Sequence, residues 1–189
     1  MKQTPRIAAL LLAAGRGTRF GGGKLAADLG GKPVAAHAAQ ALASLPFDRR
    51  IAVVSAQTPK LPDFDRITLT PAEAPLSRSI ATGIGTLAET DCDAVLIALA
   101  DMPLVPAAHF AQLISRFEGD CVATGVDGRR MVPAIFARRH FAALAGLEGD
   151  RGAGALLSQA TAVPLSEALA LDVDCPADLA LATRYLQGR

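Results

Sequence analysis

Apolar residues along this chain fall into short unbroken runs and into longer stretches with helical spacing. The three clearest runs are 7–12, 50–54 and 94–99. A strand of a parallel sheet is buried on both faces, so it reads as a continuous apolar run rather than an alternating one. The stretches with a helical period are 34–45, 77–88 and 106–117. Strands that alternate with helices predict a three-layer α/β/α fold around a mostly parallel sheet.

Shorter elements complete the pattern. Residues 121–124 and 133–136 flank Asp127-Gly128, a turn signal that predicts a hairpin and hence a short antiparallel addition to the sheet. Further pieces are predicted as extended at 67–69, 162–165 and 171–174, as short helices at 140–145 and 153–159, and as a terminal helix that Cys175-Pro176 opens. Because its sequence has no repeat or linker, the chain reads as a single domain over residues 1–189.

The first apolar run ends in a loop with unusual composition. Residues 10–24 contain five glycines, two arginines and one lysine. A loop at the carboxyl end of a strand is where open α/β sheets bind ligands, and glycines let backbone N–H groups approach an anion closely. Arg16, Arg19 and Lys24 would add charge-assisted hydrogen bonds to phosphate oxygens. The loop therefore predicts a polyphosphate cradle; the alternative is a glycine-rich surface turn whose cations are merely solvated.

Two familiar phosphate loops do not fit this segment. A Walker A loop needs Gly five residues before its Gly-Lys pair and Ser or Thr after the lysine, but Thr18 and Leu25 occupy those positions. A dinucleotide fingerprint needs a third glycine where the chain has Phe20. Neither a P-loop nor a Rossmann dinucleotide site is predicted.

A carboxylate follows the most apolar predicted strand. Asp101 comes just after the run 94–99, so it should point into the same crevice as the glycine loop. There it could hold Mg²⁺, a hard cation that takes one or two carboxylates together with phosphate oxygens. The alternative is a turn residue ahead of Pro106.

The loop resembles the signature L-A-A-G-x-x-x-R-x-G-x-x-K of the MobA-like nucleotidyltransferases, which attach a nucleotide to molybdopterin. The matching residues of this chain are Leu12-Ala13-Ala14-Gly15, Arg19, Gly21 and Lys24. This resemblance implies a Rossmann-like nucleotidyltransferase fold. It also implies the cytidylyltransferase branch, because Ala14 stands where the guanylyl branch usually has glycine. CTP is therefore preferred over GTP.

Two acidic segments resemble the metal-binding segments of the same family. Asp101 opens D-M-P-L-V, and residues 172–179 are similar to D-x-D-T-P-x-D-L, which implies that Asp174 is a second metal-binding carboxylate. Cys175 replaces the usual threonine, and no role is expected for Asp172. A competing interpretation is that Asp172 or Asp174 only places favourable charge at the start of the last helix.

Three further segments resemble the family less fully. Residues 77–84 are similar to S-x-S-L-x-x-G-L/I, so Ser79 could read a pyrimidine edge, while Ser77 could be an ordinary helix cap. Pro75 replaces a glycine in front of this segment. Met131 and Gly154 stand where the family usually has glycine and arginine. Both of these departures lie in the half expected to hold the second substrate.

The resemblance implies a Mg²⁺-dependent transfer of a nucleoside monophosphate from a nucleoside triphosphate to the phosphate of molybdopterin, with release of pyrophosphate. The implied catalytic residues are Arg19, Lys24 and Asp101. The implied nucleotide-binding residues are Leu12, Ala13, Ala14, Gly15, Arg16, Gly17, Arg19, Lys24, Ser79 and Asp101. Asp101 and Asp174 would hold the metal. A molybdoenzyme client is a further conceivable partner.

Three other functions share parts of this pattern. A cytidylyltransferase for a sugar or polyol phosphate has the glycine loop but usually another segment in place of D-M-P. An accessory protein could bind the molybdenum cofactor without catalysis. A regulatory module could bind a nucleotide as a signal.

Composition narrows the remaining classes. The net charge of +1, from 19 basic and 18 acidic residues, leaves no electrostatic footprint for nucleic acid. No segment approaches the ~20 apolar residues that span a bilayer. Lys2 and Arg6, followed by the apolar residues 7–14, resemble a short signal peptide. Cleavage there would remove the strand on which the glycine loop depends, so a signal peptide is not the favoured interpretation.

Cysteines and histidines show no pattern of their own. Cys92, Cys121 and Cys175 are an odd number without close pairing, as in a reduced cytoplasmic protein, and predict neither disulfides nor a zinc site. His37, His109 and His140 lack metal-ligand spacing and are expected to be ordinary surface or core residues.

Overall fold

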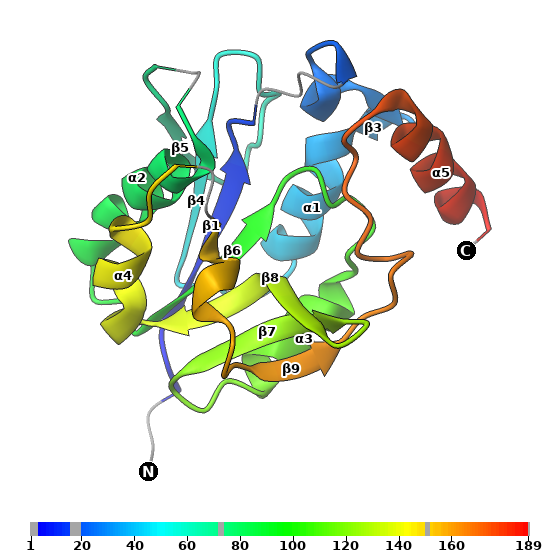
Figure 1. The fold of residues 1–189 in the computed structure, drawn as a ribbon. Coiled ribbons are helices and arrows are strands. Elements are labelled where there is room, and N and C mark those ends of the chain that lie inside the picture. The colour runs from blue at the N-terminus through cyan, green and yellow to red at the C-terminus, as the bar shows by residue number, and fades with distance from the viewer. Residues whose placement is uncertain (1–3, 16–19, 72–73, 150–151, 189) are drawn as a thin grey trace.

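A seven-stranded sheet forms the middle layer of the molecule (Figure 1). The computed structural model describes residues 4–15, 20–71, 74–149 and 152–188. The strands are β1 (Ile7–Ala13), β4 (Arg49–Val54), β5 (Asp65–Thr68), β6 (Ala94–Leu99), β7 (Cys121–Val126), β8 (Arg129–Ala137) and β9 (Thr161–Pro164). Their order across the sheet is β5-β4-β1-β6-β8-β7-β9.

Most neighbouring strands in this sheet are parallel. β5, β4, β1 and β6 form a continuous parallel set, and β9 runs parallel to β7. β8 is antiparallel to both β6 and β7, and the β7–β8 turn contains Asp127 and Gly128 with φ of 47° and 76°. The predicted mostly parallel sheet with an antiparallel hairpin is confirmed.

Helices cover both faces of the sheet. They are α1 (Val34–Ala43), α2 (Leu76–Ala88), α3 (Ala107–Ser115), α4 (Phe141–Ala145) and α5 (Pro176–Gln187), with short 3-10 helices η2 (Lys24–Ala26), η3 (Arg138–His140) and η4 (Ala153–Leu156). One core cluster joins the sheet to α1 and α3, and the other joins it to α2 and α4. The predicted three-layer α/β/α fold is confirmed.

β1 shows why the central strands read as unbroken apolar runs. Its residues alternate between the two cores: Leu11 packs in the cluster with α1 and α3, while Leu10 packs in the cluster with α2 and α4. Every residue of the strand is buried. Both faces of the strand therefore require apolar side chains.

Two predicted elements differ from the structure. Residues 171–174 form no strand: Val173 N donates to Asp101 O at 2.9 Å and Asp174 N donates to the side chain of Asp178, and these bonds make no ladder. The helix predicted at 153–159 is only the short η4.

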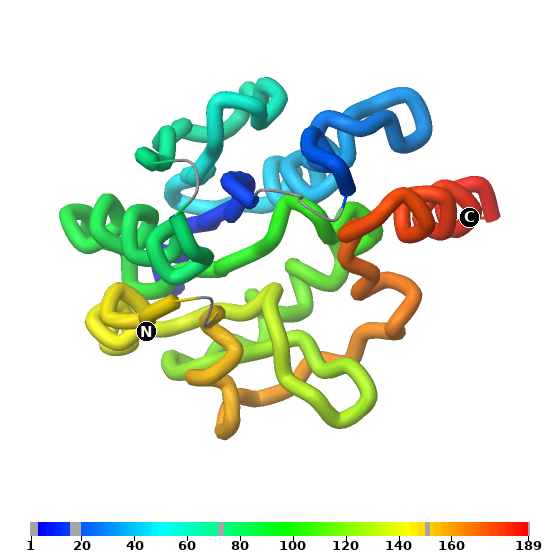
Figure 2. The backbone as a smooth tube through the Cα atoms, turned by 45° about the horizontal axis from the view of Figure 1, so that its top comes forward, coloured from blue at the N-terminus to red at the C-terminus, as the bar shows by residue number. Residues whose placement is uncertain are grey.

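A small hairpin was not predicted. β2 (Asp28–Leu29) and β3 (Lys32–Pro33) pair around Gly30 and Gly31, both with positive φ. α5 lies beside this hairpin (Figures 1 and 2), joined to it by a third small core that includes Leu29, Val173 and Ala182. None of the described helices combines the length and apolar content needed to cross a bilayer.

The chain path fixes where a ligand would bind. From β1 the chain moves to β4 and β5 on one side, then returns to β6 on the other side of β1. The carboxyl ends of β1 and β6 therefore flank the topological switch point, where open α/β sheets bind their ligands. Gly15 follows one of these strands and Asp101 follows the other.

Close packing of α2 on β1 can be tested at one glycine. A Cβ built on Gly83 would lie 2.7 Å from Leu10 Cδ2 and 3.1 Å from Leu10 Cγ, while Leu10 itself is fully buried. Gly83→Ala should therefore destabilise the protein by about 1–3 kcal/mol through overpacking. Gly85→Ala, on the same helix with nothing within 4 Å of the added Cβ, should be neutral or stabilise it by up to about 1 kcal/mol. Urea unfolding measures both; equal effects would contradict this packing.

Candidate functional site

Three predicted residues from distant parts of the sequence meet at the switch point. Lys24 Nζ lies 2.7 Å from Asp101 Oδ2 and 2.8 Å from Asp174 Oδ1. The Lys24 side chain is only 7% exposed, against 21% for Asp101 and 47% for Asp174. The ammonium group thus bridges two carboxylates within a largely enclosed crevice.

The position of Lys24 depends on the glycines before it. Gly21, Gly22 and Gly23 have φ of 84°, 96° and 68°, a region that L side chains rarely adopt. This turn leads directly into η2, whose first residue is Lys24. The glycines therefore serve to turn the chain so that Lys24 points inward.

Two backbone contacts bring the acidic segments together. Ala100 N donates to Leu12 O at 3.0 Å, which extends the β1–β6 contact to the residue before Asp101. Val173 N donates to Asp101 O at 2.9 Å, so the segment with Asp174 lies directly against Asp101.

Asp178 fixes the far side of the same segment. Its Oδ2 accepts hydrogen bonds from Asp174 N at 3.0 Å and from Cys175 N at 2.8 Å, at the start of α5. A hydrogen bond from the Cys175 side chain, and after it these two backbone bonds, lower the pKa of Asp178. A helix cap thereby holds Asp174 in place, so its role at the helix start and its place in the site are compatible.

Lys24 is held in its charged form. Burial lowers the pKa of Lys24, but the attraction of Asp101 and Asp174 outweighs burial, and the net pKa is raised. A positive charge therefore persists between the carboxylates at any physiological pH.

The donor set fits a hard divalent cation. Asp101 Oδ1 and Asp172 Oδ1 are buried and have no hydrogen-bond partner within the described part of the chain. Buried carboxylate oxygens without a partner are costly unless a cation or water satisfies them. Carboxylate oxygens are also the protein ligands that Mg²⁺ and Mn²⁺ prefer.

The amino-terminal wall of the site is formed by the end of β1. Leu12, Ala13 and Ala14 are buried, whereas Gly15 is exposed at the crevice. Arg16, Gly17 and Arg19 lie outside the described residues, so their predicted contacts with phosphate remain predictions.

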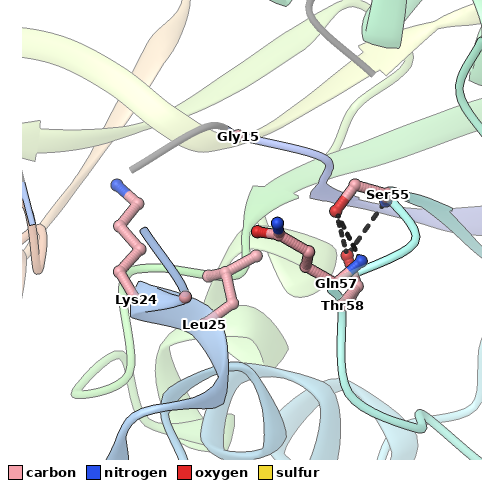
Figure 3. Close-up of a pocket in the computed structure, with 7 residues that line it drawn as sticks. Gly15, Lys24, Leu25, Ser55, Gln57 and Thr58 are labelled. Atoms are coloured by element: carbon pink, nitrogen blue, oxygen red, sulfur yellow. Dashed lines mark hydrogen bonds between the residues drawn. The ribbon is translucent and has the colours of Figure 1, made fainter. Parts of the chain in front are cut away.

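A neighbouring turn supports this wall and was not predicted. Thr58 Oγ1 donates to Ala13 O at 2.6 Å and accepts from Ser55 N at 2.9 Å. Together with Gln57, these residues line a pocket that also includes Gly15 and Lys24 (Figure 3). Ser55 directly follows β4, so the same strand-end rule that identified Asp101 could have identified this turn.

The predicted Ser79 lies on α2 with only 5% of its surface exposed. Ser77 N donates to Gly149 O at 3.3 Å, which ties the first turn of α2 to the loop after α4. Met131 lies on β8 and Gly154 in η4. No described contact joins these residues to the carboxylates, so the reading of a base by Ser79 remains a prediction.

Comparison with known proteins identifies the family. Residues 9–163 match the MobA-like NTP transferase domain. The chain belongs to this family. The match covers both the β1 loop and the segment with Asp101.

The MobA-like chain is similar in sequence or fold to proteins with several different names. It is 38% identical over 124 residues to the bifunctional enzyme IspD/IspF of Rhizorhabdus wittichii, an alignment covering 63% of this chain and 32% of that longer protein. Its fold matches Rv0371c of Mycobacterium tuberculosis with a TM-score of 0.83 at 20% identity, covering 95% of this chain and 98% of that one. The latter protein has also been crystallised with manganese, with a TM-score of 0.80 at the same identity and coverage.

A third similar fold is named for a cytidylyl product. The 4-diphosphocytidyl-2C-methyl-D-erythritol synthase of Anaerococcus prevotii matches with a TM-score of 0.71 at 15% identity, covering 97% of each chain. The chain therefore shares its fold with a protein named for a diphosphocytidyl product.

A third carboxyl group, that of Asp172, for which no role was predicted, lies near Asp101 and Asp174. Burial, and after it the charges of Asp101 and Asp174, raise the pKa of Asp172 to about 7. The sequence pattern could not predict this position of Asp172, because its environment forms only when folding brings residues 101 and 172–174 together.

This raised pKa predicts a pH-dependent cost in stability. Unfolded, the Asp172 carboxyl loses its proton near pH 4; folded, it keeps the proton up to about pH 7. The unfolded state thus binds fewer protons between these values, and stability falls as pH rises. In metal-free protein, Asp172→Asn should be more stable than wild type by roughly 1–3 kcal/mol at pH 8, and the difference should vanish below about pH 4.

Urea unfolding with a chelator present, at pH 4 and pH 8, measures this difference. Asp65→Asn is the matched control, because the Asp65 side chain is 75% exposed on the edge strand β5. A stability gap for Asp172→Asn that does not change with pH would contradict the raised pKa.

Proposed function

We propose that this protein catalyses Mg²⁺-dependent transfer of a nucleoside monophosphate from a nucleoside triphosphate to a phosphate-bearing acceptor. The observation that carries the proposal is the contact of Lys24 with Asp101 and Asp174 at the switch point, beside two carboxyl oxygens that have no hydrogen-bond partner among the residues described. Family membership supports the same reaction class.

The reaction needs positioning and charge more than a protein nucleophile. An acceptor phosphate oxygen would form a bond to the α-phosphorus, the bond from that phosphorus to the bridging oxygen would break, and pyrophosphate would leave. Asp101 and Asp174 would hold the cation, with the Asp172 carboxyl beside them. When bound there, Mg²⁺ would neutralise phosphate charge and align the reacting oxygens.

Lys24 would change partners during the cycle. Without substrate its ammonium group neutralises Asp101 and Asp174. With the metal and nucleotide in place, Lys24 would exchange these carboxylates for phosphate oxygens, where its charge offsets negative charge that grows on the leaving pyrophosphate. Arg19, and Arg16 as a third cation, would contact the same triphosphate.

The nucleotide would lie along the edge formed by β1 and α2. Amide groups after Ala14 and the amino end of α2 both favour bound anions. Ser79 on the first turns of α2 would contact the base. We propose CTP as the preferred nucleotide because Ala14 matches the cytidylyl branch.

Two acceptors have specific support. Molybdopterin is favoured by the motifs around Asp101 and Asp174. A sugar or polyol phosphate is favoured by the 38% identity to the IspD/IspF enzyme and by the diphosphocytidyl-methylerythritol synthase fold. Pyrophosphate release from CTP and Mg²⁺ with each acceptor separately distinguishes the two, and release with neither would favour a non-catalytic accessory role.

Removing one metal-binding carboxylate should abolish this release. Asp101→Asn keeps the shape of the side chain but removes its charge, so pyrophosphate release should fall by a factor of at least about 100, equivalent to about 3 kcal/mol in the barrier. Asp65→Asn, far out on β5, should keep the wild-type rate. A wild-type rate for Asp101→Asn would refute its assigned role.

Removing Lys24 should affect metal and nucleotide in opposite directions. Lys24→Met leaves two carboxylates without their cation, so metal-free protein should lose about 2–3 kcal/mol of stability and bind free Mn²⁺ more tightly. Nucleotide binding and turnover should fall, because the phosphates lose a cationic partner.

Electron paramagnetic resonance of Mn²⁺ and urea unfolding with and without Mn²⁺ measure these effects. Lys32→Met is the control, since Lys32 Nζ contacts only the Gln40 amide oxygen among described hydrogen bonds, at 2.5 Å on the surface. Weaker Mn²⁺ binding by Lys24→Met would show that Lys24 supports the metal rather than takes its place.

A further inference from the structure

A second group of metal-ligating side chains lies at the end of the sheet opposite to the candidate nucleotide site, where β6 and β7 begin. Cys121, the first residue of β7, pairs with Phe136 of β8, which in turn pairs with Val95 near the start of β6. Asp101 follows the other end of β6. The group around Cys121 is therefore separated from the candidate nucleotide site by the length of a strand.

Three different donor atoms meet there. Asp120 Oδ1 lies 2.6 Å from His140 Nε2, and the ligand atoms of Asp120, Cys121 and His140 all lie within 4.8 Å of one another. The backbone fixes their arrangement, because Ala137 N donates to Asp120 O at 2.8 Å just before η3 delivers His140. Sequence spacing predicted no zinc site here, because His140 is distant from Cys121 along the chain.

We propose that Asp120, Cys121 and His140 bind a zinc-class divalent cation, with water in the fourth position. Carboxylate oxygen, thiolate sulfur and imidazole nitrogen together match the borderline character of Zn²⁺, whereas Mg²⁺ prefers oxygen ligands alone. Donor atoms that share a tetrahedral zinc lie about 3–4 Å apart, so modest side-chain adjustment brings this group to that geometry.

The surroundings allow a cation to enter. Asp120 is 66% exposed and His140 27% exposed, while Cys121 is buried at the base of the group. Arg139 Nη2 contacts Asp120 Oδ1 at 2.6 Å and its Nη1 donates to Gly119 O at 2.5 Å, so a cation would have to displace the first of these contacts. On binding, the thiol S–H bond would be replaced by a sulfur–metal bond with the proton going to solvent. His140 Nε2 would release the proton it shares with Asp120, also to solvent, with the ring keeping its proton on Nδ1, and would bind the cation through its lone pair.

An activated thiol is the main alternative use of a Cys–His–Asp group. Reactive cysteines have a lowered pKa and an exposed sulfur. Burial, and after it the charge of Asp120, instead raise the pKa of Cys121 to about 11. His140 also directs its Nε2 at Asp120. These features do not favour nucleophilic chemistry at Cys121.

Titration with Co²⁺ tests this site directly, because a cobalt–thiolate bond produces a charge-transfer absorption band that oxygen ligands do not. Wild-type protein should show this band with one equivalent of Co²⁺, and Zn²⁺ should remove it by displacement. Cys121→Ser should abolish the band, and His140→Ala should weaken Co²⁺ binding by at least about tenfold. Circular dichroism checks that each variant is folded.

The necessary control concerns Cys175, which is adjacent to the proposed metal ligand Asp174. The band should persist in Cys175→Ser and in Asp101→Asn, and the Cys121 and His140 variants should keep wild-type pyrophosphate release if the proposed function holds. A band that is lost in Cys175→Ser but kept in Cys121→Ser would overturn the proposal. No band in folded wild-type protein would overturn it equally.

Discussion

Two ionised carboxylates that face one crevice repel each other unless a positive charge stands between them. Here that charge is Lys24, whose ammonium group contacts Asp101 and Asp174 at 2.7 and 2.8 Å. Near it, Asp101 Oδ1 and Asp172 Oδ1 are buried with no hydrogen-bond partner among the described residues, which is costly in the absence of a ligand. This cost is tolerated because the sheet and the cap at α5 hold the groups in place. Buried acidic oxygens without partners are typical of a binding site rather than of a structural ion pair.

The sheet topology determines which residues can share that crevice. β1 and β6 are adjacent in the sheet although the long segment 14–93 separates them in the sequence. This is possible because the chain first forms β4 and β5 on the other side of β1. Their carboxyl ends therefore open into one gap that neither strand's own connection covers. The last part of the chain reaches this gap through a single backbone hydrogen bond from Val173 to Asp101. Substrate-binding loops of very different sequence could be attached to this frame without disturbing it, which agrees with the varied names of similar folds.

Features set by local sequence were predicted well. β6 has the predicted bounds Ala94–Leu99, since burial on both faces leaves an unmistakable apolar run. Asp101 was proposed for the site from its place after this strand, and Lys24 from the composition of the glycine loop. Features created by long-range contact were not predicted. Asp172 differs from many surface aspartates because folding buries its carboxyl group and puts two other carboxylates near it. Ser55 and Thr58 support β1 through a hydrogen bond to Ala13, and neither residue type by itself suggests this. The β2–β3 hairpin is too short to leave a period in the sequence.

The two ends of the sheet also differ in their chemistry. At the carboxyl end the side chains of Asp101, Asp172 and Asp174 offer oxygen atoms, which favour hard cations and phosphate-bound magnesium. At the amino end Cys121 and His140 offer sulfur and nitrogen beside Asp120, a set that such hard cations bind poorly. Proteins select between these metals by the type of donor atom rather than by overall affinity. A cation bound at the proposed amino-end site would therefore not compete with one at the proposed nucleotide site. The antiparallel β7–β8 hairpin makes this separation possible. Because β8 runs opposite to β6, it returns the chain to the amino end of β6, where η3 places His140 beside Cys121.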